Sequence, residues 1–180
     1  VFPWDQKGTG RTLIYGENTW NEAKVWVCDG NSFALMGDGT NAFIYKFYVN
    51  NLEAKNCYRI SSSVATDVLS ADFYAFSSTR SVLFYVKNNT LYAYNYDIGN
   101  ERVDMIPLET TDQITMLKFD LTMEPMKDAL FIATYNTAEG GTLRKYYVGN
   151  NPDKVELKAD PTAVWKGLTK VKNMSWRAVL

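Results

Sequence analysis

The stretch Leu83–Tyr96, LFYVKNNTLYAYNY, limits what this chain can fold into more than any other segment. Two short runs of β-branched and aromatic residues flank the polar pair Asn88-Asn89, and such runs are typical of strands. Asn tolerates a positive φ better than most residues, and a tight primed turn requires positive φ. The stretch therefore predicts a hairpin in which Val82 to Val86 pairs with Thr90 to Tyr96.

The second strand of this hairpin has no polar face. Its side chains are apolar or aromatic on both sides of the predicted ribbon: Leu91, Tyr92, Ala93, Tyr94 and Tyr96. A strand with one solvated face alternates between apolar and polar residues, whereas a strand covered on both faces does not. We therefore expect an inner strand that is packed above and below.

The same arrangement recurs along the chain. A second hairpin is predicted from Leu130–Tyr135 through a turn at Glu139–Gly141 to Thr142–Val148, and a third joins Val25–Cys28 to Ser32–Met36. Further β-rich runs lie ahead of or behind these hairpins, at 70–76, 102–108, 114–119 and 154–158. Four strands per unit, repeated about every 45 to 50 residues, are typical of propeller blades.

The predicted fold class is all-β, as a partial β-propeller of four-stranded antiparallel blades, with a β-sandwich as the alternative. We expect residues 1–180 to form a single propeller-like domain or fragment, because 180 residues leave little room for two full domains. The approximate blades are 12–61, 68–108 and 114–158, with the start of a further blade at 169–180. One short helical turn is expected at Asn18–Lys24.

Charge and hydropathy exclude several partners. Lys and Arg number 19 against 20 acidic residues, so the net charge is −1, and a nucleic-acid footprint is not expected. The nearest basic cluster, Lys166–Lys172, is interpreted as a solvated strand face. No apolar run approaches the length needed to span a bilayer. The chain opens VFPWDQ without Met, which favours a mature product or an excised piece of something longer.

Catalytic and metal-binding signatures are not found in the sequence. Because the chain has no His, it offers no Ser-His-Asp or Cys-His arrangement and no histidine metal site. Cys28 and Cys57 lack zinc-site spacing, and either a disulfide or a pair of buried thiols is compatible with them. We therefore assign no catalytic, cofactor-binding or metal-binding residue, and expect no cofactor.

Acidic residues offer two weaker alternatives. A carboxylate pair could serve glycoside hydrolysis, and the candidates are Asp29, Asp38, Asp67, Asp72, Asp97 and Glu139. Most of them stand beside Gly or Asn, where turn formation already explains them. Oxygen ligands at Asp29, Asn31 and 38–41 would suit calcium, but the spacing of an EF-hand is missing and a hairpin turn is favoured.

Tryptophans provide the candidate ligand-binding residues. Trp4 and Trp20 lie in turn-rich sequence, where an exposed indole could serve as a platform for a sugar ring. The other interpretation is that they close the ends of the core, as amphipathic rings often do. Trp26 and Trp176 lie on predicted strands and are expected in the core.

A family resemblance adds to this interpretation. The segment WKGLTKVKNMSW, Trp165–Trp176, resembles the end of Bacteroidota surface lipoproteins of the PKD-like family. LFYVKNNTLYAYNY and ALFIATYNTAEGGTLRKYYVGN also resemble the propeller-like C-terminal portion of that family, so the resemblance covers most of the chain. It implies an extracytoplasmic protein, either secreted or held at the outer-membrane surface by a lipid anchor outside this chain, that serves nutrient capture. It implies no reaction and brings no functional residues.

The predicted function is a non-enzymatic binding or interaction module. Its expected partner is a glycan or a protein of an outer-membrane uptake complex. A glycoside hydrolase or lyase with a carboxylate pair in the propeller mouth is one alternative, and a purely structural scaffold is the other.

Overall fold

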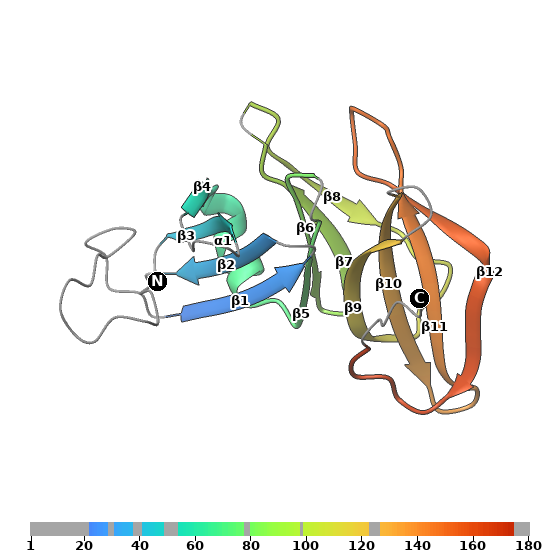
Figure 1. Cartoon of the computed structure of the whole chain (residues 1–180). Helices are drawn as coiled ribbons and strands as arrows, with labels where there is room; N and C mark the ends of the chain where they lie inside the picture. The colour runs from blue at the N-terminus through green and yellow to red at the C-terminus, as the bar shows by residue number, and fades with distance from the viewer. Residues whose placement is uncertain are drawn as a thin grey trace. The chain divides into compact units, whose positions relative to one another are not determined.

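Strands dominate the chain. The computed structural model describes residues 22–28, 31–37, 41–48, 54–77, 80–97, 99–122 and 127–174 (Figure 1). These residues form three antiparallel four-stranded sheets, and each joins its strands in simple sequence order. The predicted all-β class is therefore confirmed. The chain divides into two compact units, Val1–Leu69 and Ser70–Leu180, which we describe in turn.

The first unit contains one sheet. Its strands are β1 (Glu22–Cys28), β2 (Asn31–Gly37), β3 (Ala42–Tyr48) and β4 (Ala54–Ile60). Ala34, Met36 and Tyr45 form a buried cluster on this sheet, with Phe43 packed against it. The predicted hairpin of β1 and β2 is confirmed, with Cys28 opposite Asn31.

The strand order tests the disulfide interpretation of the cysteines. Cys28 lies on β1 and Cys57 on β4, the two edges of the sheet, with β2 and β3 between them. Because neighbouring strands lie about 4.8 Å apart, three spacings place the two Cα atoms about 14 Å or more apart. A disulfide requires Cα atoms within about 7 Å. The fold therefore excludes a disulfide between Cys28 and Cys57 of the same chain.

The helix prediction was wrong. Of the expected turn at Asn18–Lys24, residues 22–24 belong to strand β1, and the rest lies outside the described residues. A helix forms instead at α1 (Ser62–Leu69), where Val64 N and Ala65 N both donate to Ser61 O. Ala65 and Val68 are its buried residues. The sequence of α1 carries β-branched residues and is one short stretch, so its helical periodicity was hard to see.

The second unit begins with the sheet that contains the central hairpin. Its strands are β5 (Phe73–Phe76), β6 (Val82–Lys87), β7 (Thr90–Asn95) and β8 (Arg102–Ile106). Lys87 pairs with Thr90 across a two-residue turn, and Asn88 and Asn89 have φ of 50° and 58°. This is the predicted primed turn. The packing expected on both faces of the second strand is also confirmed, because Leu91 and Ala93 on one face of β7 and Tyr94 on the other are buried.

The third sheet follows in the same unit. Its strands are β9 (Gln113–Thr122), β10 (Lys127–Asn136), β11 (Gly140–Val148) and β12 (Leu157–Leu168). The β10–β11 hairpin is confirmed, but its turn is Thr137–Glu139, with Asn136 opposite Gly140 at a φ of 79°. A glycine in that conformation is usual after a three-residue hairpin loop.

The last strand was misplaced by the sequence analysis. The run expected at 154–158 is mostly a connection, and β12 extends to Leu168. Its pairing with β11 shifts register twice, once between Ala159 and Val164 and once between Trp165 and Leu168, so its side chains do not alternate cleanly. Of the further blade expected at 169–180, residues 169–174 contain no strand, and 175–180 lie outside the described residues.

Residues 169–174 instead pack back onto the third sheet. Val171 and Met174 contact the buried cluster that includes Met116 and Phe131. Lys170 donates to Gln113 Oε1 (2.9 Å), and its Nζ lies 5.5 Å from the centre of the Tyr135 ring. A Cβ at Gly141 would collide with Thr169 O, so only glycine fits there. The predicted exposure of the basic cluster holds for Lys166, Lys170 and Lys172, but of these three only Lys166 lies on a strand, β12.

The two sheets of the second unit are joined at several points. The β6–β7 turn reaches β9 through Asn89 Oδ1, which accepts from Ile114 N (2.7 Å). Tyr146 on β11 donates to Glu109 Oε2 (3.0 Å), in the connection after β8. Successive sheets that contact one another occur in propellers and in sandwiches alike. The propeller arrangement and the single-domain assignment therefore stay predictions.

Candidate functional site

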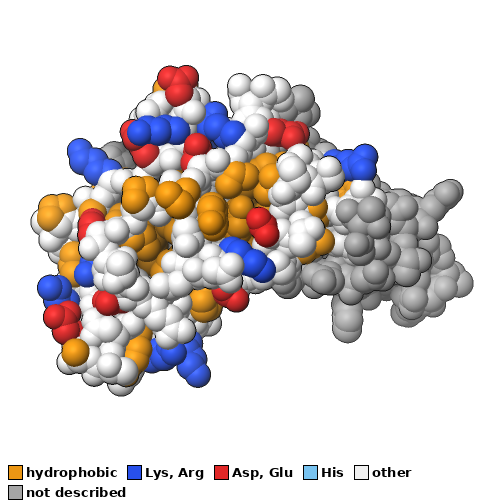
Figure 2. Space-filling view, turned by 180° about the vertical axis from the view of Figure 1, so that it is seen from behind, with side chains coloured by type: hydrophobic (Ala, Val, Ile, Leu, Met, Phe, Trp, Pro, Cys, Tyr) orange, Lys and Arg blue, Asp and Glu red, His pale blue; other side chains and the backbone are white. Residues whose placement is uncertain are grey.

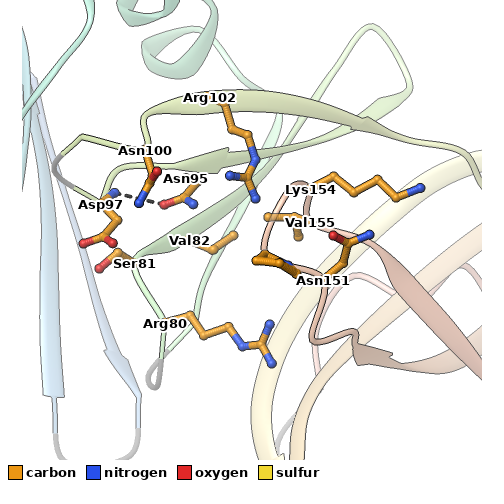
Figure 3. Close-up of a pocket in the computed structure, with 11 residues that line it drawn as sticks. Arg80, Ser81, Val82, Asn95, Asp97, Asn100, Arg102, Asn151, Lys154 and Val155 are labelled. Atoms are coloured by element: carbon orange, nitrogen blue, oxygen red, sulfur yellow. Dashed lines mark hydrogen bonds between the residues drawn. The ribbon is translucent and has the colours of Figure 1, made fainter.

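A pocket of about 400 Å³ in the second unit is the candidate site (Figure 3). We call it the Arg102 pocket. Three segments that are distant in the sequence line it: residues 80–82 at the start of β6, the β7–β8 connection with its flanking residues, and the β11–β12 connection. Its volume lies within the range of about 300–1,000 Å³ that is usual for small-molecule sites.

The β7–β8 connection is held in shape by its own side chains. Asn95 Oδ1 accepts from Asp97 N (2.9 Å), and Asn100 N donates to Asp97 O (3.0 Å). Gly99 has a φ of 84°, which permits the tight return. This local turn places the side chains of Asn95, Asp97 and Asn100 along one side of the Arg102 pocket (Figure 3).

The β11–β12 connection contains the same kind of side-chain-capped turn. Asn151 Oδ1 accepts from Asp153 N (2.9 Å), as Asn95 does for Asp97. Gly149 N donates to Glu156 O (2.9 Å) and closes the loop. Asn-x-Asp therefore occurs at both places, and in this pattern the amide oxygen of Asn accepts a hydrogen bond from the backbone N two residues later.

Two arginines fix the segments relative to one another. Arg80 donates from its guanidinium to Gly149 O and Asn150 Oδ1, which ties the start of β6 to the β11–β12 connection. Arg102 Nε donates to Asp104 Oδ2 (3.1 Å), and the same oxygen accepts from Val155 N (2.7 Å). Figure 3 shows both guanidinium groups extending toward the pocket from different sides.

The chemistry that this arrangement supports is polar recognition. Guanidinium, amide, hydroxyl and carboxylate groups surround a small apolar floor that includes Val82 and Val155. Among the described residues that line the pocket, Asp97 is the one carboxylate. A glycosidase mechanism uses two carboxyl groups across the scissile bond. The lining therefore suits binding better than glycoside hydrolysis.

Two titratable groups with altered pKa values do not line this pocket. Burial, followed by the hydrogen bond to Glu109, raises the pKa of Tyr146 above its usual range. Hydrogen bonds from the hydroxyl and the backbone N of Thr162 (2.7 and 3.0 Å) hold the pKa of Asp160 below its usual value. Asp160 also accepts from the Tyr147 hydroxyl (3.2 Å).

Comparisons with known proteins identify no relative. Protein-family models, curated proteins and solved structures all give no match to this chain. The resemblance to PKD-like surface lipoproteins thus stays a prediction.

Most residues singled out from the sequence do not meet at one place. Trp4, Trp20, Asp29 and Asp38 lie outside the described residues. Asp67 is exposed on α1, Asp72 is exposed ahead of β5, and Glu139 is exposed in the β10–β11 turn. Asp97 is also a turn residue, as predicted, but its position after β7 makes it part of the Arg102 pocket.

Several notable residues were missed. Arg80, Arg102 and Asn151 carry no signal of their own, although the shared Asn-x-Asp pattern at 95–97 and 151–153 could have drawn attention to both connections. Large apolar side chains are exposed on two sheet-edge strands: Val103 and Met105 on β8, and Val164 and Trp165 on β12. Figure 2 shows one face of the molecule, where hydrophobic side chains lie among charged ones.

Two further searches cover only the residues that the structure describes. In that part of the chain, no helix has the length and apolar character to cross a membrane. No group of three or more Cys, Asp or Glu side chains there could hold a metal ion.

Proposed function

We propose that this chain is a non-enzymatic binding module and that the Arg102 pocket is its ligand site. The observation that carries the proposal is the convergence of polar side chains from three segments onto one cavity, with each segment fixed by its own hydrogen bonds. Preorganised groups lose little conformational entropy when a ligand binds, so such a site is better suited to recognition than a set of mobile side chains.

A hydroxyl-rich ligand, such as a glycan, fits this lining best. Amide and guanidinium groups donate hydrogen bonds, and the Asp97 carboxylate accepts them, so both halves of a sugar hydroxyl find partners. The proposed setting is extracytoplasmic, at the bacterial outer-membrane surface, with nutrient capture or an uptake protein as the wider role. That setting depends on the family resemblance.

The test is a glycan array probed with the full chain and four single variants. We expect Asp97→Asn to weaken binding of the ligand found on the array by about tenfold or more, because one charge-assisted hydrogen bond contributes about 1.5–3 kcal/mol. Asp67→Asn is the matched control, since it removes the same charge from an exposed position on α1. Its binding should equal that of the parent chain.

Trp4→Ala and Trp20→Ala test the site expected from the sequence. If either variant abolishes binding while Asp97→Asn binds normally, the ligand site is at the tryptophans and the Arg102 pocket is rejected. If the parent chain binds nothing on the array, the glycan proposal fails altogether.

A further inference from the structure

We infer that the ligand of the Arg102 pocket is a hydroxylated acid, and specifically a glycan that carries a carboxylate, such as a uronic acid. This inference rests on the proposed binding function and adds the chemical class. The inference comes from the pocket-lining groups that are not already engaged within the protein. Among these groups, hydrogen-bond donors outnumber acceptors.

Arg102 provides the first of these donors. Its Nε is engaged by Asp104 Oδ2 at 3.1 Å, and Asp104 is itself held by Val155 N at 2.7 Å. Within the part of the chain that the structure describes, the two terminal nitrogens of Arg102 make no hydrogen bond. The side chain is 24% exposed, so its orientation is restrained while these nitrogens remain accessible. A guanidinium edge of this kind matches the two oxygens of a carboxylate.

The two turn asparagines offer the ligand hydrogen-bond donors, because the acceptor oxygen of each amide is already engaged. Asn95 Oδ1 and Asn151 Oδ1 are each occupied by the backbone N two residues later, so the part of each amide that faces a ligand is its NH₂ group. Lys154 adds an ammonium, which also pairs with Glu156 at 3.4 Å. A ligand that meets these groups must be rich in acceptors, which an anion is.

The opposite end of the pocket explains why the acid should also carry hydroxyls. Asp97 and Ser81 lie together on the side away from Lys154 and Asn151 (Figure 3). A carboxylate accepts hydrogen bonds only, so Asp97 selects a donor on the ligand, and a sugar hydroxyl is such a donor. A bare inorganic anion would satisfy Arg102 and leave Asp97 without a partner.

The test compares three probes on the full chain by isothermal titration calorimetry: digalacturonic acid, its dimethyl ester and inorganic sulfate. The ester keeps the hydroxyls and the shape but removes the charge. We expect the acid to bind at least tenfold more tightly than the ester, and sulfate to bind more weakly than the acid. Addition of salt should weaken the acid more than the ester, because screening acts on the charged pair.

Variants of Arg102 test whether this residue causes the preference for the acid over the ester. Arg102→Gln should remove the tenfold preference for the acid over the ester, and Arg102→Lys should retain part of it, because it keeps the charge and loses the planar edge. Lys158→Gln makes the same change of charge on an exposed side chain outside the pocket and should bind like the parent. The ester comparison needs no variant, so it decides the question even if Arg102→Gln does not fold.

The outcomes separate the two proposals. Equal binding of acid and ester overturns the inference and leaves the binding function intact, provided that Asp97→Asn weakens both. Sulfate binding as tightly as the acid also overturns it, because the site would then recognise any anion. If neither digalacturonic acid nor its ester binds while a neutral glycan from the array does, the inference fails and the proposed function stands. If no glycan binds, the inference and the proposed function both fail.

Discussion

At the scale of single residues, several asparagines of the second unit shape turns and link its sheets. Asn88 and Asn89 take the positive φ values that a two-residue hairpin requires. Asn89 also links two sheets, because its amide donates to Asp112 O (3.2 Å) and accepts from Ile114 N (2.7 Å). The local role could be predicted from the sequence, whereas the link to β9 depends on how the two sheets meet.

The two asparagines of this turn allow a matched comparison. Asn88→Ala and Asn89→Ala force the same strained φ on alanine, but only Asn89→Ala also removes the partner of Ile114 N. We therefore expect Asn89→Ala to lower the free energy of unfolding by about 1–3 kcal/mol more than Asn88→Ala. Urea denaturation of both variants measures the difference. Equal losses would show that the bond to Ile114 contributes nothing.

At the scale of elements, the C-terminal segment after β12 is the least expected feature. The sequence predicted that a further blade begins there, but Val171 and Met174 lie on the face of the third sheet, over Met116 and Phe131. A sheet with two apolar faces needs cover on both, and this segment supplies part of it. The mixture of apolar and charged residues at 169–174 fits an edge strand and an irregular segment packed on a sheet face equally well. The sequence pattern therefore could not distinguish the two.

Substitutions in this segment should follow the packing. Val171→Ala and Met174→Ala remove partly buried methyl and methylene groups, and each should lower the free energy of unfolding by about 1–2 kcal/mol. Lys172→Ala, an exposed neighbour, should change it by less than about 0.5 kcal/mol. Thermal or urea unfolding distinguishes them, and equal effects at Val171 and Lys172 would contradict the packing described here.

At the scale of the whole molecule, the chain forms two compact units, and each sheet lies within one of them. Within Ser70–Leu180, polar contacts join the second and third sheets: Arg80 to Gly149, Asp104 to Val155, and Tyr146 to Glu109. These contacts bring together residues that are far apart in the sequence. Their formation is therefore coupled to the packing of the two sheets.

The contact at Tyr146 predicts a dependence of stability on pH. Burial and the Glu109 carboxylate raise the pKa of Tyr146, so the folded state favours the neutral phenol. The stabilisation is fully present below the unfolded-state pKa of about 10 and is lost as the pH rises toward the folded-state value. Unfolding free energies measured between about pH 8 and pH 11 should fall more steeply for the parent chain than for Tyr146→Phe. Parallel profiles would show that Tyr146 ionises equally easily in both states.

The sequence by itself determined the all-β class, the three hairpins and the turn at Asn88-Asn89. Each of these depends on residues that are neighbours in the chain, where strand propensity and turn conformation act directly. Helix α1, the end of β12 and the cover over the third sheet were not predicted, because short segments with mixed patterns take their conformation from what they pack against. The Arg102 pocket was decided by the tertiary structure alone. Arg80, Arg102 and Asn151 come together only when two sheets pack, and that pairing depends on long-range register, which no local pattern specifies.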